Sequence, residues 1–141
     1  MATAGATWFI TGVQLEPGST ATPFERRSYG QELALCQRYY EKSYNQSVVP
    51  GTGDGNGAFY TLRIDSIGGG STSFKVSKRA APTVTIYSPF SGTSGVARNY
   101  TTSADVTASP QSAGDNNFYL LAGSATTGNG LGIQFTASAE L

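Results

Sequence analysis

Short alternating segments separated by turns constrain the fold of this chain more than any other feature of its sequence. Beyond residue 57, apolar and polar residues alternate over short stretches, most clearly in residues 83–87 (TVTIY). Such alternation is typical of strands that are buried on one face, and small-residue turns such as residues 91–95 separate the stretches. About six to eight short strands with turns every ~8–12 residues predict a mainly β chain, folded as an antiparallel β-sandwich or open barrel.

The sequence divides into three parts. Residues 1–29 are predicted to form an N-terminal strand (residues 8–15) and a Pro/Gly/Ser/Thr hinge, and residues 30–44 a helix. Residues 45–141 are predicted to form a β-sandwich domain that makes a single compact unit with the helix. Its strands are expected in residues 58–64, 72–77, 83–87, 117–122 and 131–139, with one or two weaker strands in residues 100–108.

The predicted helix has an apolar stripe. Leu33, Cys36, Tyr40 and Tyr44 follow one another at spacings of three, four and four residues, which places them on one face of a helix. A helix of about 14 residues is marginal alone, so this face must be covered. Packing against the chain's own sheet is the default expectation. The alternative is a cluster of helices around a threefold axis, in which these four residues form the oligomer interface.

The charge balance disfavours two classes of partner. Nine Lys and Arg residues balance nine Asp and Glu residues, and only 13% of the residues are charged. A neutral, charge-poor surface gives no electrostatic reason to bind nucleic acid or an anionic membrane, and it suits contacts between subunits. No segment approaches the ~20 apolar residues that span a bilayer.

Catalytic and metal chemistry are also disfavoured. The chain has no histidine, so a Ser-His-Asp or Cys-His site is impossible and the commonest zinc ligand is missing. The single cysteine, Cys36, is expected to be a buried small hydrophobe, with a reactive thiol or an intersubunit disulfide as alternatives. Residues 54–57 (DGNG) lack the further acidic ligands of a calcium loop, and residues 51–57 are expected to form a flexible hairpin or connecting loop. We therefore expect no enzyme activity, no cofactor and no metal.

Two sequence motifs in the N-terminal third resemble motifs of known proteins. GVQLEPGSTATPFE (Gly12 to Glu25) and ELALCQRYY (Glu32 to Tyr40) stand in order at short spacing. Together they resemble a junction of tailed-bacteriophage virion proteins, especially tail fibres and receptor-binding proteins. Residues 78–88 (KRAAPTVTIYS) and 135–141 (FTASAEL) also resemble parts of such proteins.

The resemblance implies a place in the virion. It implies a structural component near the tip of a fibre, forming a homotrimer and contacting other virion proteins, and it carries over no catalytic residues. In those proteins the first motif forms the last strand of a jelly roll that resembles a carbohydrate-binding module. Residues 1–7 are too few for such a domain, so we expect either a short protein or a fragment of a longer fibre.

The leading hypothesis is a tail-fibre or spike tip domain that contacts a bacterial surface polysaccharide. Such recognition stacks sugar rings on aromatic faces, with amides and carboxylates bonding to sugar hydroxyls. Ordinary turn chemistry is the simpler explanation of the same Asp and Asn residues. The candidate glycan-binding residues are Asp115, Asn116, Asn117 and Tyr119, and a second pair, Asn99 and Tyr100.

Two other functions stay open. The chain could be a purely architectural collar, connector or capsid-decorating protein without a ligand, or a polysaccharide depolymerase. An architectural protein should bury Tyr100 and Tyr119, whereas a glycan binder should leave them exposed. A depolymerase should bring two carboxylates within about 5–10 Å of each other in a groove.

Overall fold

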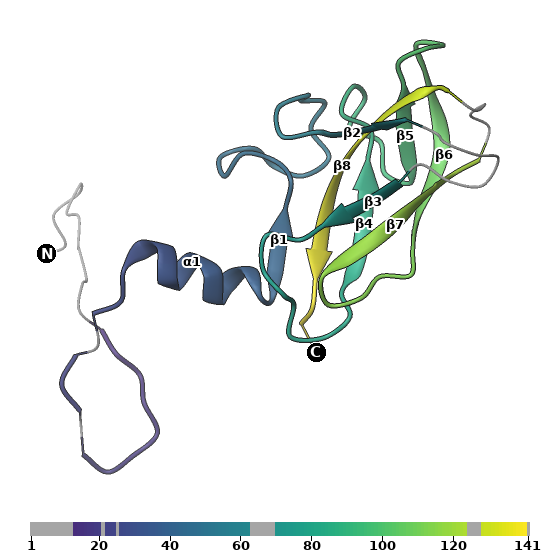
Figure 1. The fold of residues 1–141 in the computed structure, drawn as a ribbon. Coiled ribbons are helices and arrows are strands. Elements are labelled where there is room, and N and C mark those ends of the chain that lie inside the picture. The colour runs from purple at the N-terminus through teal and green to yellow at the C-terminus, as the bar shows by residue number, and fades with distance from the viewer. Residues whose placement is uncertain (1–12, 21, 25, 63–69, 124–127, 141) are drawn as a thin grey trace, which may run out of the picture.

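The fold is one curled antiparallel sheet with a helix projecting from it (Figure 1). The computed structural model describes residues 13–20, 22–24, 26–62, 70–123 and 128–140. The sheet has eight strands, which confirms the mainly β prediction of a sandwich or open barrel. The elements are α1 (Tyr29–Gln37), β1 (Tyr40–Lys42), β2 (Phe59–Leu62), β3 (Gly70–Ser73), β4 (Thr83–Tyr87), β5 (Val96–Asn99), β6 (Ala104–Gln111), β7 (Asn117–Ala122) and β8 (Gly130–Ser138).

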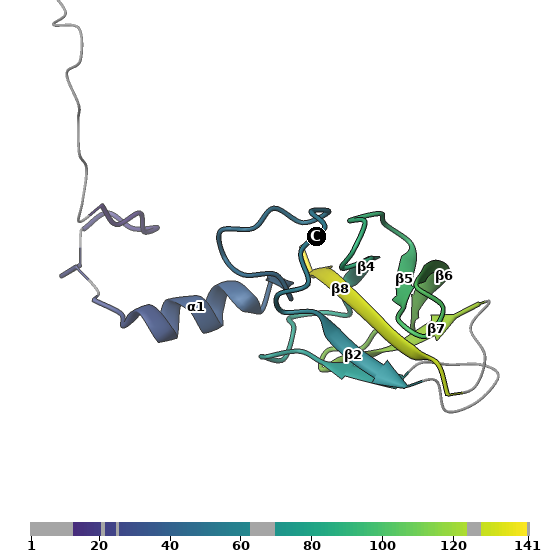
Figure 2. The same ribbon diagram turned by 90° about the horizontal axis from the view of Figure 1, so that it is seen from above.

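Strand β8 organises the sheet. Its C-terminal half pairs with β1 and β4, and its N-terminal half pairs with β2 and β5. The sheet continues from β5 through β6 and β7 to β3, and all of these pairs are antiparallel. Its curl brings β3 back toward β2, since a Cβ added at Gly70 would lie 2.6 Å from the Thr61 Oγ1 atom. Figure 2 shows β8 running across the sheet beside β2.

The core lies inside this curl. Along β8, Leu131, Ile133, Phe135 and Ala137 alternate with residues of the outer face, and all four are buried. The centroid of the Phe135 ring lies 5.2 Å from that of Phe118 on β7, and the two ring planes make an angle of 70°. The period-two pattern of the sequence therefore corresponds to one face turned inward, as the prediction required.

The sequence predicted most strands of the sheet. The bounds of β4 and β7 are as predicted, and β2, β6 and β8 overlap their predicted segments. The strand expected in residues 72–77 is displaced toward the N-terminus, because β3 spans Gly70–Ser73. The next residue, Phe74, follows the strand and has its ring buried in the core. Strand β5 was not predicted, and residues 63–69, where part of one strand and a turn were expected, lie outside the described residues.

The predicted helix of residues 30–44 is wrong in its second half. Ser28 caps α1 by accepting a hydrogen bond from the Gln31 amide at 3.4 Å, and the helix ends at Gln37. Residues 40–42 instead form β1, in which Tyr40 pairs with Ser138 of β8. Pairing with β8 overrides the good helix propensities of Glu41 and Lys42, because tertiary contacts routinely outweigh local preference.

Helix α1 projects from the β-domain and is attached to it at its C-terminal end. In both views it extends away from the sheet, starting beside β1 (Figures 1 and 2). None of its residues is buried, so Cys36, expected inside, is exposed. Lys78 fixes its C-terminal end, because the buried ammonium donates a hydrogen bond of 2.6 Å to the Gln37 carbonyl.

The segment before α1 is a closed loop. The Glu16 carboxylate accepts hydrogen bonds from the amide and the hydroxyl of Thr22, both at 2.5 Å. These bonds lower the pKa of Glu16 from its ordinary value, the side-chain bond to Thr22 most strongly. Residues 13–16 are not in a strand, and the rest of the predicted strand, residues 8–12, lies outside the described residues.

Candidate functional site

A pocket between two exposed tyrosines, Tyr60 and Tyr100, lies on the outer face of β8. Because Leu131 and Ile133 point into the core, their neighbours Gly130 and Gly132 face outward. Glycine has no side chain, so the strand presents bare backbone at these two positions. The absence of side chains leaves room for groups from the flanking strands to cover the backbone or to frame a pocket over it.

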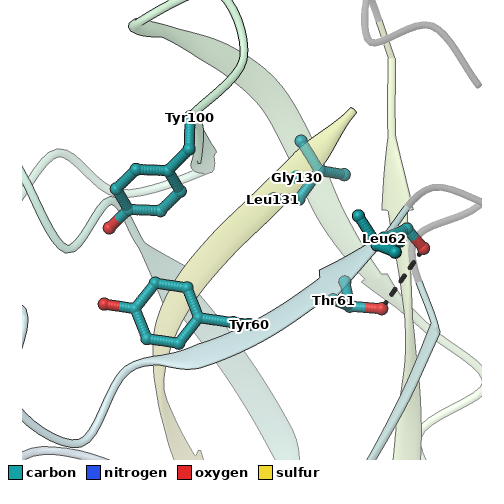
Figure 3. A pocket seen from close by; sticks show the side chains of 6 residues that line it. All are labelled: Tyr60, Thr61, Leu62, Tyr100, Gly130 and Leu131. Atoms are coloured by element: carbon teal, nitrogen blue, oxygen red, sulfur yellow. Dashed lines mark hydrogen bonds between the residues drawn. The ribbon is translucent and has the colours of Figure 1, made fainter. Parts of the chain in front are cut away.

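Strand pairing places the walls of this pocket. On β2, Tyr60 stands opposite Gly132 and Leu62 stands opposite Gly130. On the other side, Tyr100 follows β5 directly, and its amide donates a hydrogen bond of 2.9 Å to the Gly130 carbonyl. Two tyrosines that are 40 residues apart in sequence therefore meet over one stretch of β8 (Figure 3).

The two tyrosine rings meet at an angle and stay open to solvent. The centroids of the Tyr60 and Tyr100 rings are 5.4 Å apart, and the ring planes are tilted by 49°. Tyr60 is 57% exposed and Tyr100 is 46% exposed. Only glycine fits beneath them, because a Cβ at Gly132 would lie 2.6 Å from Tyr100 Cε2 and 3.2 Å from Tyr60 Cε1.

The pocket has an apolar end and a hydroxyl end. Its volume is ≈ 360 Å³, within the range of about 300–1,000 Å³ that is usual for small-molecule sites. Figure 3 shows both phenol hydroxyls pointing to the same side, away from Leu62. None of the residues that line the pocket is charged: they are Tyr60, Thr61, Leu62, Tyr100, Gly130 and Leu131.

The surroundings keep the Tyr100 phenol protonated. Partial burial of the group, followed by the neighbouring Tyr60 hydroxyl, raises the pKa of Tyr100 to about 12. Arg98 and Asp105 act on it in opposite directions and are paired with each other at 3.4 Å. The phenol of Tyr100 is therefore neutral at ordinary pH, when it can both donate and accept hydrogen bonds.

Of the predicted pair Asn99 and Tyr100, only Tyr100 lines the pocket. The Asn99 side chain is buried, and its carbonyl oxygen accepts hydrogen bonds from the amides of Thr101 and Thr102 at 3.0 and 3.2 Å. Its amide donates to the Asn129 side chain at 2.9 Å. Asn99 thus has no free polar group for a ligand, and its role is to hold the turn that carries Tyr100.

The other predicted group lies elsewhere on the sheet. Tyr119 pairs with Gln111 at the far end of β6, whereas Asn99 pairs with Ala104 at its start. Seven residues of strand separate these two positions, or about 23 Å. In the turn, the carbonyls of Asp115 and Asn116 bind backbone amides at 2.7 and 2.8 Å, while the side chains of Asp115, Asn116 and Asn117 are exposed and Tyr119 is partly exposed.

The predicted oligomer residues lie around one groove. Leu33 and Cys36 of α1 and Tyr40 of β1 line a space of ≈ 510 Å³ between the helix and the sheet. Tyr44 lines it too, but this side chain is only 3% exposed. Its ring packs edge-on against Tyr87, at 6.1 Å between centroids, so Tyr44 belongs to the β-domain rather than to a helical stripe.

The sequence alone did not point to Tyr60, or to Gly130 and Gly132 beneath it. The signal that could have found Tyr60 is the pattern of residues 59–62, where Phe59 and Tyr60 place aromatic rings on both faces of one strand. Tyr60 and Leu62 are both exposed on the same face of β2, and a contiguous exposed apolar patch can mark a contact surface. Its meeting with Tyr100 depends on the strand register, which the sequence does not display.

Several comparisons and searches bear on this site. No family model, no curated protein and no solved structure matches the chain. In the described residues, no group of three or more His, Cys, Asp or Glu side chains could hold a metal ion. None of the helices in the described ranges has the length and apolar character that crossing a membrane requires. The pocket lining offers aromatic rings and hydroxyl groups.

Proposed function

We propose that this protein is a structural domain of a bacteriophage virion, at the tip of a tail fibre or spike, which binds a polysaccharide of the bacterial surface. The place in the virion is supported by the resemblance of residues 12–25 and 32–40 to the junction of phage fibre proteins. The binding role is supported by the pocket over β8. No catalytic step is part of this proposal.

One observation carries the binding role: the open pair of Tyr60 and Tyr100. Aromatic side chains normally bury most of their surface. The exposure of two adjacent rings, each about half exposed above Gly132, therefore calls for an explanation. The C–H face of a sugar ring would cover them and release water from both surfaces. This exposure of Tyr100 is what we expected of a glycan binder and not of an architectural piece.

A purely architectural role is the second candidate, and α1 is the feature that favours it. A nine-residue helix with no buried residue is too short to be stable in water without a partner. We propose that Leu33, Cys36 and Tyr40 are covered by neighbouring copies in a homotrimer, or by other virion proteins. Such assembly is compatible with a glycan site, because the groove beside α1 and the tyrosine pocket have no lining residue in common.

Binding to bacterial cells tests the proposed function. The full chain, fluorescently labelled, should bind host cells, and purified surface polysaccharide should compete with it. A Tyr60→Ala/Tyr100→Ala variant should bind far less, whereas Tyr39→Ala, at a tyrosine that is 45% exposed outside the pocket, should bind like the parent. Failure to bind any strain or polysaccharide would leave the architectural role as the better account.

A separate measurement tests the place in the virion. Antibodies raised against the purified domain should decorate one end of intact phage particles in electron micrographs. Uniform labelling of capsids would favour a decorating protein, and absence from purified particles would refute a virion role. The mass of the purified chain in solution tests the homotrimer, since a stable monomer would contradict it.

A further inference from the structure

We infer that the pocket formed by Tyr60, Leu62 and Tyr100 over Gly130 and Gly132 binds an uncharged pyranose ring. The ring lies across the two tyrosines, and its hydroxyls face the two phenol hydroxyls. This inference rests on the proposed function and adds the chemical class of the ligand. Three features of the pocket carry it: its charge, the position of its polar groups, and the spacing of its rings.

The charge of the pocket selects against acidic sugars. None of its lining residues is a cation, and Arg98, the nearby cation that acts on Tyr100, is already engaged. The Arg98 guanidinium lies 3.4 Å from the Asp105 carboxylate and 4.2 Å from the centre of the Phe90 ring. A carboxylate entering the pocket would lose water and gain only neutral phenol hydroxyls as partners, with no cation to offset its charge, which is costly.

The polar groups of the pocket suit hydroxyls. Both phenols point to one side of the pocket, so they offer donors and acceptors at a single edge of a bound ring (Figure 3). Since the pKa of Tyr100 is raised to about 12, this phenol stays a donor throughout the physiological range. Leu62, the Gly130 backbone and the ring faces then meet the C–H face of the sugar, which is the apolar part of the same ligand.

The spacing of the rings selects against a flat base held between them. A planar ring stacked on both sides needs about 7 Å between the flanking rings, because carbon atoms pack at about 3.5 Å. The Tyr60 and Tyr100 centroids are only 5.4 Å apart, and the planes are tilted by 49°. A ligand must therefore lie across both rings from the open side. A puckered ring with one apolar face fits this surface better than an intercalated base.

Equilibrium binding of small probes tests the ligand class. Methyl β-D-galactopyranoside, methyl β-D-glucopyranoside, methyl β-D-glucuronide and tetramethylammonium chloride would each be titrated into the full chain and followed by saturation-transfer NMR. At least one neutral glycoside should bind, and the glucuronide should bind at least about tenfold more weakly. Tetramethylammonium tests the competing idea that the two rings hold a cation by cation–π attraction.

Matched variants locate the binding. Tyr100→Ala should weaken the neutral glycoside about tenfold or more, in line with the usual cost of a lost stacking partner. Tyr100→Phe keeps the ring packing and should lose only the share due to the hydroxyl, so it remains informative if the alanine variant is unstable. Gly132→Ala should weaken binding by moving the rings, while Tyr39→Ala, which removes a tyrosine that is 45% exposed outside the pocket, is the control that should leave it unchanged.

The possible outcomes separate this inference from the proposed function. Tighter binding of the glucuronide or of tetramethylammonium would overturn the uncharged ligand. Glycoside binding that survives every pocket substitution would overturn the site but leave glycan binding standing. If surface polysaccharide binds through Tyr60 and Tyr100 while no neutral glycoside does, the inference fails and the proposed function holds. If neither polysaccharide nor glycoside binds, both fail.

Discussion

Breaking the ion pair between Glu41 and Lys78 should destabilise the protein more than any other single change of charge that we consider. The Lys78 ammonium lies 2.5 Å from the Glu41 carboxylate, and the two side chains are 2% or less exposed. The carboxylate also accepts the Lys75 amide at 3.1 Å, and the ammonium donates to the Gln37 carbonyl at 2.6 Å. The pair thus ties α1, β1 and the chain after β3 together in a place that water does not reach.

The magnitude follows from this burial. Lys78→Met leaves a buried carboxylate without its counter-ion, and Glu41→Gln leaves a buried ammonium in the same state. Removing one member of a buried pair costs about 3–5 kcal/mol, a large part of the ~5–15 kcal/mol that holds a typical domain folded. If the two residues acted independently, the losses would add to about 6–10 kcal/mol.

The double variant Glu41→Gln/Lys78→Met should cost much less than that sum. It removes both charges and leaves mainly the Gln37 carbonyl and the Lys75 amide with poorer partners, at about 1–3 kcal/mol each. We therefore expect the free energy of unfolding of the double variant to fall by about 2–6 kcal/mol. A double-mutant cycle should then show a favourable coupling energy between the two side chains.

Urea unfolding followed by far-ultraviolet circular dichroism measures these free energies, with the slope checked for constancy across the variants. The exposed pair of Arg27 and Glu32 is the matched control, because its atoms are 3.1 Å apart but its side chains are 39% and 48% exposed. Neutralising either control residue should cost at most about 1 kcal/mol. Losses at Glu41 and Lys78 as small as those of the control, or strictly additive ones, would refute the reasoning.

Three further predictions concern Gly132, Gly57 and Tyr100. Gly132→Ala should lower the free energy of unfolding by about 1–3 kcal/mol, since the Tyr100 ring must move, and the near-ultraviolet circular dichroism should change with it. Gly57→Ala should cost at least about 2 kcal/mol in urea unfolding, because Gly57 has a φ of +77° and an added Cβ would meet the Ser43 carbonyl; a neutral result would contradict the tight packing of this loop. The raised pKa of Tyr100 means that the folded protein keeps a proton that the unfolded chain loses, so its contribution to stability should be complete below pH 10 and decline as the pH rises to about 12. Tyr100→Phe should remove that part of the alkaline decline, and an identical decline in the variant would show that other groups cause it.

The sequence predicted those elements whose local pattern and long-range partners agree. Residues 83–87 alternate, and β4 occupies this segment because its backbone pairs with β8 while Val84 and Ile86 pack into the core. Residues 40–42 follow a run of helix formers, and their local preference says nothing of Ser138, which pairs with Tyr40 from almost 100 residues away. The carboxylate of Glu41 is charged, so its burial could not be predicted without knowing where Lys78 lies.

The candidate site was half predictable for a similar reason. Tyr100 stood out because it follows a turn-forming asparagine, and the local sequence is enough to suggest such a place. Tyr60 became part of the same site only through its register with Gly132. The loop of residues 51–57, expected to be flexible, is instead held by the buried side-chain amide of Gln134, which donates to the carbonyls of Asp54 and Asn56. In each case a contact between distant strands decided the outcome.

Turn chemistry and ligand binding were competing explanations of Asn99 and Tyr100, and the structure separates the two residues: Asn99 bonds within the turn, whereas Tyr100 lines the pocket over β8. Asn99 is buried and fixes the turn through the amides of Thr101 and Thr102, and the turn in turn sets the position of the Tyr100 ring. Gly132 gives that ring its place on β8. Asn99 and Gly132 therefore determine the shape of the pocket in the ligand-free protein. A site arranged in this way loses little conformational freedom on binding, which favours even a ligand that offers only weak stacking and a few hydrogen bonds.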